Sequence, residues 1–243
     1  SAYDLKKLDL IFIILLLVLV SKAQPPDCVF TNSQFTIHFG AGDVDDINIT
    51  DLSFYRRVSS SCPTDGHYSF VPYTSSCFRD DWHTLSEDHT PGAGGNMLLV
   101  NAAPYEGVFL TTMVRNLKSN TIYELGLWLM NLCKPTRKCP YPLLPILNIR
   151  LETPEGKLVA SINTGELPRV EEPQWTQHRA YFTTPASITT LKLIMSNTMP
   201  GGCGNDFALD DITFRECIKQ NPPVTTAPKT TSNAKQSTTT KPP

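Results

Sequence analysis

The sequence lacks the features that mark nucleic-acid-binding and membrane-spanning proteins. It carries 21 basic and 23 acidic residues, and the part between residues 24 and 219 keeps 15 basic and 21 acidic ones. No basic stripe is present, which excludes nucleic acid and anionic membrane surfaces as partners of this part. The longest apolar run, 10–20, has 11 residues and is too short for a helix across a bilayer about 30 Å thick.

The sequence also lacks catalytic motifs. There is no Gly-x-Ser-x-Gly nucleophile elbow. Asp210 and Asp211 are adjacent in an expected strand, so their side chains should point to opposite faces and cannot form a glycosidase pair. Four polar residues of one loop could do acid–base work, but we expect them to brace the loop instead. They are His83, Glu87, Asp88 and His89. We therefore expect no enzymatic activity.

Helical periodicity over three turns is missing as well, and short strand-like runs recur between Pro, Gly, Asn and Asp clusters. About ten strands without crossover helices predict two packed antiparallel sheets, an all-β jelly-roll β-sandwich. The expected strands are 35–39, 68–71, 96–101, 108–114, 122–129, 146–152, 158–162, 175–183, 190–197 and 207–215.

The two ends of the chain do not look like parts of a domain. Residues 1–23 combine two lysines, an apolar run and Ser21-Lys22-Ala23, which predicts a signal peptide cleaved after Ala23, with an uncleaved anchor as the alternative. Residues 219–243 are rich in Pro, Thr and Lys and predict a disordered linker. The sandwich domain should therefore span 26–218.

All seven cysteines follow the expected signal peptide, so disulfides are the default interpretation. A Cys-x-x-Cys pair, as zinc sites use, is absent. The short loop between Cys133 and Cys139 favours a bond between them, and the hairpin-like stretch between Cys62 and Cys77 favours a second. Cys28 and Cys217 would meet if the first and last strands are neighbours. Cys203 is then expected to be free.

Two motifs carry a resemblance to a known family. The stretch DHTPGAGGNMLLVNAA (88–103) and the closing GNDFALDDITFREC (204–217) resemble the extracellular MAM domain. They are also similar to modules of exported surface proteins of Bacteroidetes and to carbohydrate-binding sandwiches. The resemblance implies a jelly-roll sandwich of the galactose-binding-like or MAM-like kind. It also implies a non-catalytic adhesion or ligand-binding module on a secreted or surface-displayed bacterial protein. Because the cysteine spacing differs from that of animal MAM domains, animal adhesion partners are not implied.

The expected ligand is a glycan or a protein partner at the cell surface. Trp82, Tyr105, Trp175 and Tyr73 could stack on sugar rings, although packing within the sandwich is the favoured role of each. Trp128 is expected in the core. Together with the polar loop, the candidate ligand-binding set is Trp82, His83, Glu87, Asp88, His89, Tyr105 and Trp175. The alternative function is a structural spacer or assembly subunit of a cell-envelope complex.

Asp210 needs an explanation of its own. Alternation places it on the same face as Ile212 and Phe214, which must point into the core. A buried carboxylate needs a cation or several hydrogen-bond donors. One hypothesis is a structural Ca²⁺ held by Asp210 and Asp211 with Asp43 and Asp45. The other is that Asp210 accepts backbone N–H bonds from the glycine-rich 200–205 loop while Asp211 faces solvent.

Overall fold

The computed structural model describes residues 24–25, 27–33, 35–40, 55–90, 94–136 and 138–219. These residues form twelve strands and no helix, so none of them belongs to a helix that could cross a membrane. The predictions for the signal peptide, for the linker beyond Lys219, and for Asp43 and Asp45 fall outside the described residues.

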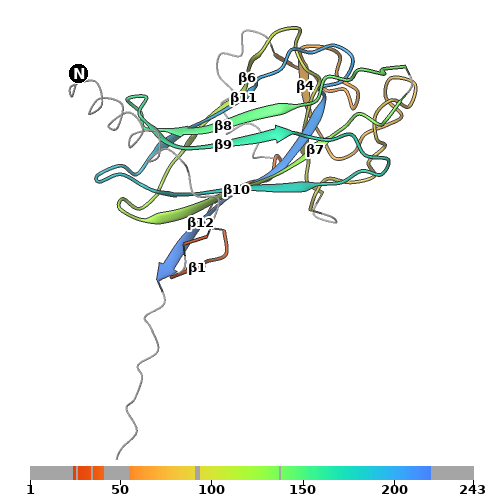
Figure 1. The fold of residues 1–243 in the computed structure, drawn as a ribbon. Helices are drawn as coiled ribbons and strands as arrows, with labels where there is room; N and C mark the ends of the chain where they lie inside the picture. The colour runs from red at the N-terminus through yellow and green to blue at the C-terminus, as the bar shows by residue number, and fades with distance from the viewer. Residues whose placement is uncertain are drawn as a thin grey trace, which may run out of the picture.

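The strands form two sheets that pack face to face (Figure 1). In the larger sheet the order is β10 (Thr176–Thr183), β7 (Ile122–Asn131), β12 (Phe207–Lys219), β5 (Met97–Val100), β4 (His67–Val71) and β3 (Arg56–Arg57). The smaller sheet has the order β6 (Gly107–Val114), β11 (Leu191–Asn197), β8 (Ile146–Glu152) and β9 (Leu158–Glu166). All pairs are antiparallel except β3 with β4. The prediction of an all-β sandwich of the jelly-roll class is confirmed.

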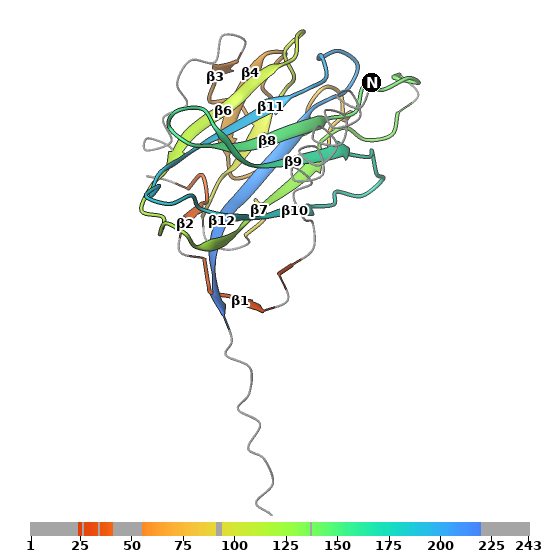
Figure 2. The same ribbon diagram turned by 60° about the vertical axis from the view of Figure 1, so that its left-hand side comes forward.

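The two ends of the domain lie side by side. The strands β1 (Cys28–Phe30) and β2 (Phe35–Ile37) both pair antiparallel with β12. Figure 2 shows β1 beside the far end of β12. The Cys28–Cys217 disulfide joins the same two strands. The prediction that the first and last strands are neighbours is therefore confirmed.

All ten predicted strands are present, with ends displaced by a few residues. The strands that the sequence did not predict are β1 and β3, of three and two residues. Strands this short have too few alternating positions to produce a recognisable pattern.

The main core fills the space between the sheets. In β8, Leu147, Ile149 and Leu151 are fully buried, while Asn148 and Arg150 between them are partly exposed. This alternation is typical of a sheet with one face on the core and one face exposed to solvent. In the larger sheet the same core takes Leu125, Leu127 and Leu129 of β7.

A second, smaller core lies on the outer face of the larger sheet. Met97 and Leu99 of β5 point away from the main core and pack with Trp82 and Leu85 from the loop between β4 and β5. Trp128 also lies on this outer face, because its neighbours Leu127 and Leu129 belong to the main core. It is only partly buried, so the prediction that it is a core residue is wrong.

Three disulfides link the described cysteines. Cys28–Cys217 and Cys62–Cys77 form as predicted. The predicted Cys133–Cys139 bond is wrong: Cys139 pairs with Cys203, and Cys133 is the free cysteine. The reason is that Cys133 belongs to the second core, whereas Leu143, just after Cys139, bridges to Gly204 and brings the two loops together. Three disulfides indicate a protein that folds in an oxidising, extracytoplasmic compartment.

Candidate ligand-binding pocket

A β-bulge interrupts β12 at its two aspartates. Asp210 pairs with Trp128 of β7 and Thr213 pairs with Gly126, so β12 has one extra residue between the pairs. Asp211 takes the extra position with a left-handed backbone, φ 49°. Consequently Leu209 and Ile212 both face the main core, and Asp210 lies on the outer face. The predicted sharing of one face by Asp210, Ile212 and Phe214 is wrong, as is the separation of the two aspartates onto opposite faces.

Asp211 is the centre of a hydrogen-bond cluster on the outer face. Its Oδ1 lies 3.0 Å from Nδ1 of His38, and its Oδ2 lies 2.6 Å from Nδ1 of His89 and 2.5 Å from Oγ1 of Thr90. Burial opposes the ionisation of Asp211, but the hydrogen bonds from His89, Thr90 and His38 outweigh it and hold its pKa below the ordinary value. With 8% of its surface exposed, Asp211 does not face solvent as predicted.

Asp210 is buried beneath the 88–90 loop, which contains His89 and Thr90. Its Oδ2 accepts the backbone N–H of His89 at 3.0 Å, and its Oδ1 accepts that of Asp211 at 2.8 Å. Backbone donors do satisfy this carboxyl group, but one comes from the 88–90 loop and the other from the adjacent Asp211, and neither comes from the predicted 200–205 loop. Burial, and after it the negative charge of Asp211, raise the pKa of Asp210 to about 8. Asp210 is therefore largely protonated at neutral pH.

His89 holds the loop against the sheet. Its ring stacks on Trp128 with the ring centres 4.1 Å apart, and it meets the edge of Trp175 at 5.6 Å. Asp88 is also buried here, and burial followed by the charge of Asp211 raises its pKa. Of the predicted ligand-binding set, the structure brings together Asp88, His89 and Trp175 in this way.

The remaining predicted residues lie elsewhere. Trp82 and His83 are buried at 2% and 1% exposure, and Trp82 packs in the second core. Glu87 is exposed, and Tyr105, at 66% exposure, lies on the surface before β6. Among the described residues, no group of three or more His, Cys, Asp or Glu is placed to hold a metal ion. Since Asp43 and Asp45 lie outside those residues, calcium stays a prediction.

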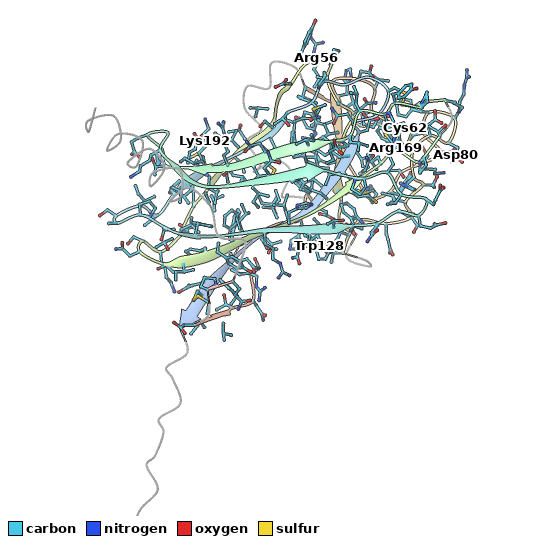
Figure 3. All side chains as sticks on the ribbon, in the orientation of Figure 1. Arg56, Cys62, Asp80, Trp128, Arg169 and Lys192 are labelled. Carbon is cyan, nitrogen blue, oxygen red and sulfur yellow. A yellow bond between two sulfur atoms is a disulfide. The ribbon has the colours of Figure 1, made fainter. Side chains whose placement is uncertain are left out.

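A cavity of about 200 Å³ opens at one end of the sandwich. Figure 3 shows the labelled Arg169 at this end, opposite Lys192. The lining residues come from six loops between strands, and the Cys139–Cys203 disulfide joins two of these loops. The lining includes the charged residues Asp65, Asp81, Lys138, Arg169 and Asp206. It also includes Phe78, Trp82 and Cys133.

Asp206 lines the cavity and accepts hydrogen bonds from three separate segments of the chain. Its carboxylate accepts the indole N–H of Trp82 at 3.0 Å, the backbone N–H of Ala102 at 3.1 Å and the thiol of Cys133 at 3.3 Å. It is 7% exposed, and burial raises its pKa to about 6 in spite of these donors. At neutral pH the cavity therefore contains a nearly buried carboxylate with a fixed orientation.

Arg169 brings a positive charge to the cavity, opposite in sign to that of Asp206. Within the described part of the chain it has no hydrogen bond or ion pair, and its Nε is buried without an acceptor. Gly204 makes room for the guanidinium, because a Cβ there would lie 2.8 Å from Nη2 of Arg169. A buried N–H donor without an acceptor is unfavourable. A ligand that offers an oxygen to Arg169 would remove this cost.

Cys133 could in principle act as a nucleophile in the cavity. Burial, and after it the neighbouring Asp206, raise the pKa of its thiol far above the ordinary value. Because the thiolate is the reactive form, this thiol is suited to packing and not to chemistry.

Sequence reasoning missed Arg169 and Asp206. Asp206 stands in the GNDFALDDITFREC motif, directly before the closing strand, so a polar residue at a strand end was a usable signal. Arg169 follows Pro168 in a loop with no distinguishing pattern. Only the folded chain brings these two residues to one cavity.

No protein family matches the chain, and no curated protein matches it. Among solved structures, it is similar to the enzymatically active domain of tailspike protein 4 of bacteriophage CBA120, with 12% identity and a TM-score of 0.43, over 75% of this chain and 22% of that one. An apo cyclase from Fischerella sp. has 14% identity and a TM-score of 0.42, over 81% of this chain and 90% of that one. A family 16 carbohydrate-binding module has 19% identity and a TM-score of 0.32, over 51% and 78%. These values show a distant likeness and assign neither family nor function, so the resemblance to MAM domains stays a prediction.

Proposed function

We propose that this chain is a non-catalytic ligand-binding module that works outside the cytoplasm and recognises a glycan or a protein partner. The observation that carries the proposal is the cavity with Arg169 unpaired beside the oriented carboxylate of Asp206. Binding sites are concave and combine apolar walls with a few fixed polar groups. Here Trp82 and Phe78 supply the apolar walls.

Two features support a non-catalytic role. The thiol of Cys133 is kept protonated, and Asp206 is already engaged by three donors. A general acid or base must instead be free to exchange a proton with a substrate. Groups fixed in this way are suited to recognition.

The proposal is tested by comparing the wild type with Arg169→Met on a glycan array and in capture of partner proteins. We expect a ligand that the wild type binds and Arg169→Met loses by at least tenfold, since hydrogen bonds to charged groups contribute about 1.5–3 kcal/mol each.

Arg115→Met is the matched control for this comparison. Arg115 is exposed and directly follows β6, whose Met113 pairs with Lys192 at the opposite end of the sandwich. Binding that survives Arg169→Met would reject the cavity as the site. A blank array together with no captured partner would favour the alternative of a structural spacer.

A further inference from the structure

The rim of the cavity is built on an unusual turn. Phe78, Arg79 and Asp80 all have a left-handed backbone, with φ of 52°, 57° and 70°. For residues other than glycine this conformation is unfavourable and normally occurs singly. Strained backbone of this kind is kept where the surrounding structure enforces it, and it is concentrated at functional sites.

The surrounding contacts fix this turn on both sides. The Cys62–Cys77 disulfide ends immediately before it. Lys134 pairs with Asp80 at 2.9 Å and Lys138 pairs with Asp81 at 3.1 Å. The result is that the ring of Phe78 stands at the cavity, 39% exposed, with its centre 4.9 Å from that of Trp82.

The charges of the lining select the class of ligand. Two further charged residues of the lining, Lys138 and Asp81, are paired with each other. An anion would satisfy Arg169 but would meet the carboxylates of Asp65 and Asp206, while a cation would meet Arg169. A hydroxyl group both donates and accepts. A ring with neighbouring hydroxyls can therefore accept from Arg169 and donate to Asp206 at the same time. The apolar C–H face of such a ring can pack on an exposed aromatic ring such as Phe78.

The size of the cavity limits how much of the ligand enters. Its volume of about 200 Å³ lies below the range of about 300–1,000 Å³ found for sites that enclose drug-sized ligands. A cavity of this volume suits one sugar ring better than several linked rings. The lining residues belong to loops at the end of the sandwich where Arg169 lies, and not to a sheet face (Figure 3).

We propose that the cavity binds one neutral sugar ring at the end of a glycan chain, packed on Phe78 and hydrogen-bonded by Arg169 and Asp206. This inference rests on the proposed ligand-binding function and adds the ligand class, the number of rings and the residues that select them. The aromatic contact gives affinity, and the pair of opposite charges gives selectivity for hydroxyls.

The test is titration calorimetry of the full chain with defined probes. The probes are the methyl glycosides of glucose, galactose, mannose and xylose, the linear trimers of these sugars, and the methyl glycosides of glucuronate and galacturonate. We expect at least one neutral glycoside to bind, its trimer to bind within twofold of it, and the uronates to bind at least tenfold more weakly.

Two variants and two controls assign the binding to the cavity. We expect Phe78→Leu and Arg169→Met each to weaken binding at least tenfold. Phe35→Leu and Arg115→Met should leave it unchanged, because Phe35 lies on β2 and Arg115 follows β6, outside the cavity lining. Unfolding midpoints of all four variants show that the fold is retained.

Each other outcome overturns a stated part of the inference. Tighter binding of a uronate that Arg169→Met abolishes would reject the neutral ligand and leave the ligand-binding function. A trimer that binds tenfold more tightly than its monosaccharide would reject the single ring. If no probe binds but a captured protein is lost in Arg169→Met, the sugar is rejected and the ligand-binding function remains. Sugar binding unaffected by both variants would reject the cavity itself.

Discussion

Asp210 is a buried carboxyl group whose proton is part of the folded structure. Its pKa is about 8 in the fold, whereas an unfolded chain has an aspartate pKa near 3.9. Between these values the native state binds a proton that the unfolded state does not. Because stability then falls as pH rises, Asp210 should destabilise the fold progressively from about pH 4 to pH 8.

Asp210→Asn should remove most of this pH dependence. Asparagine resembles the protonated acid, since it is neutral and keeps an oxygen for a backbone N–H of the 88–90 loop. We expect the free energy of unfolding of the wild type to decline from pH 5 to pH 8. In Asp210→Asn it should decline only up to about pH 6, where Asp206, with its pKa of about 6, still contributes. Urea unfolding at each pH measures this.

Asp80→Asn is the control for that series. Asp80 is exposed and paired with Lys134, which lowers its pKa, so its removal should leave the decline in place. Equal slopes in the wild type and Asp210→Asn would contradict the assignment of a raised pKa to Asp210.

At the scale of single elements, periodic strands were predictable and their interruptions were not. The alternation of Leu147, Ile149 and Leu151 predicts both β8 and the face that it buries. The same rule fails in β12, because Asp211 adopts a left-handed backbone without being a glycine. No residue in FALDDITF signals the bulge, so Ile212 and Phe214 were correctly predicted in the core but Asp210 was wrongly assigned to the same face.

The candidate site was less predictable than the strands, because it is made by loops that meet only after folding. The 88–90 loop and the two aspartates belong to the two motifs that carry the family resemblance, and hydrogen bonds do join them. The contacts of Cys139 with the 203–204 loop connect segments 64 residues apart. Loop length favoured Cys133 as its partner, but Cys133 packs in the second core, whereas Leu143 bridges the loop of Cys139 to Gly204.

The 88–90 loop also provides the test of the calcium hypothesis. All four carboxyl oxygens of Asp210 and Asp211 already accept hydrogen bonds, and Asp210 is largely neutral at pH 7, which makes it a poor calcium ligand. We therefore expect the unfolding midpoint at pH 7 to be the same in calcium and in chelator. A lower midpoint in chelator, with no such difference in Asp210→Asn, would support a calcium site completed by Asp43 and Asp45.

At the scale of the whole molecule, two of the disulfides close loops of very different length. Cys28–Cys217 closes a loop of 189 residues, whereas Cys62–Cys77 closes one of 15. By the entropy of the unfolded chain these cross-links contribute about 5 and about 3 kcal/mol. The long-range bond also keeps the three-residue β1 on β12.

When each pair of cysteines is replaced by alanine, the two double variants should therefore rank in opposite order in stability and in ligand binding. We expect Cys28→Ala/Cys217→Ala to lower the free energy of unfolding more than Cys62→Ala/Cys77→Ala does. Ligand binding should follow the reverse order, because Cys77 directly precedes the strained turn that presents Phe78 to the cavity, while Cys28 and Cys217 are outside the cavity lining. Urea unfolding and calorimetric titration, both at a temperature where each variant is folded, give the two orders. If binding instead declines in proportion to stability, the Phe78 turn has no special role and the cavity depends only on the fold as a whole.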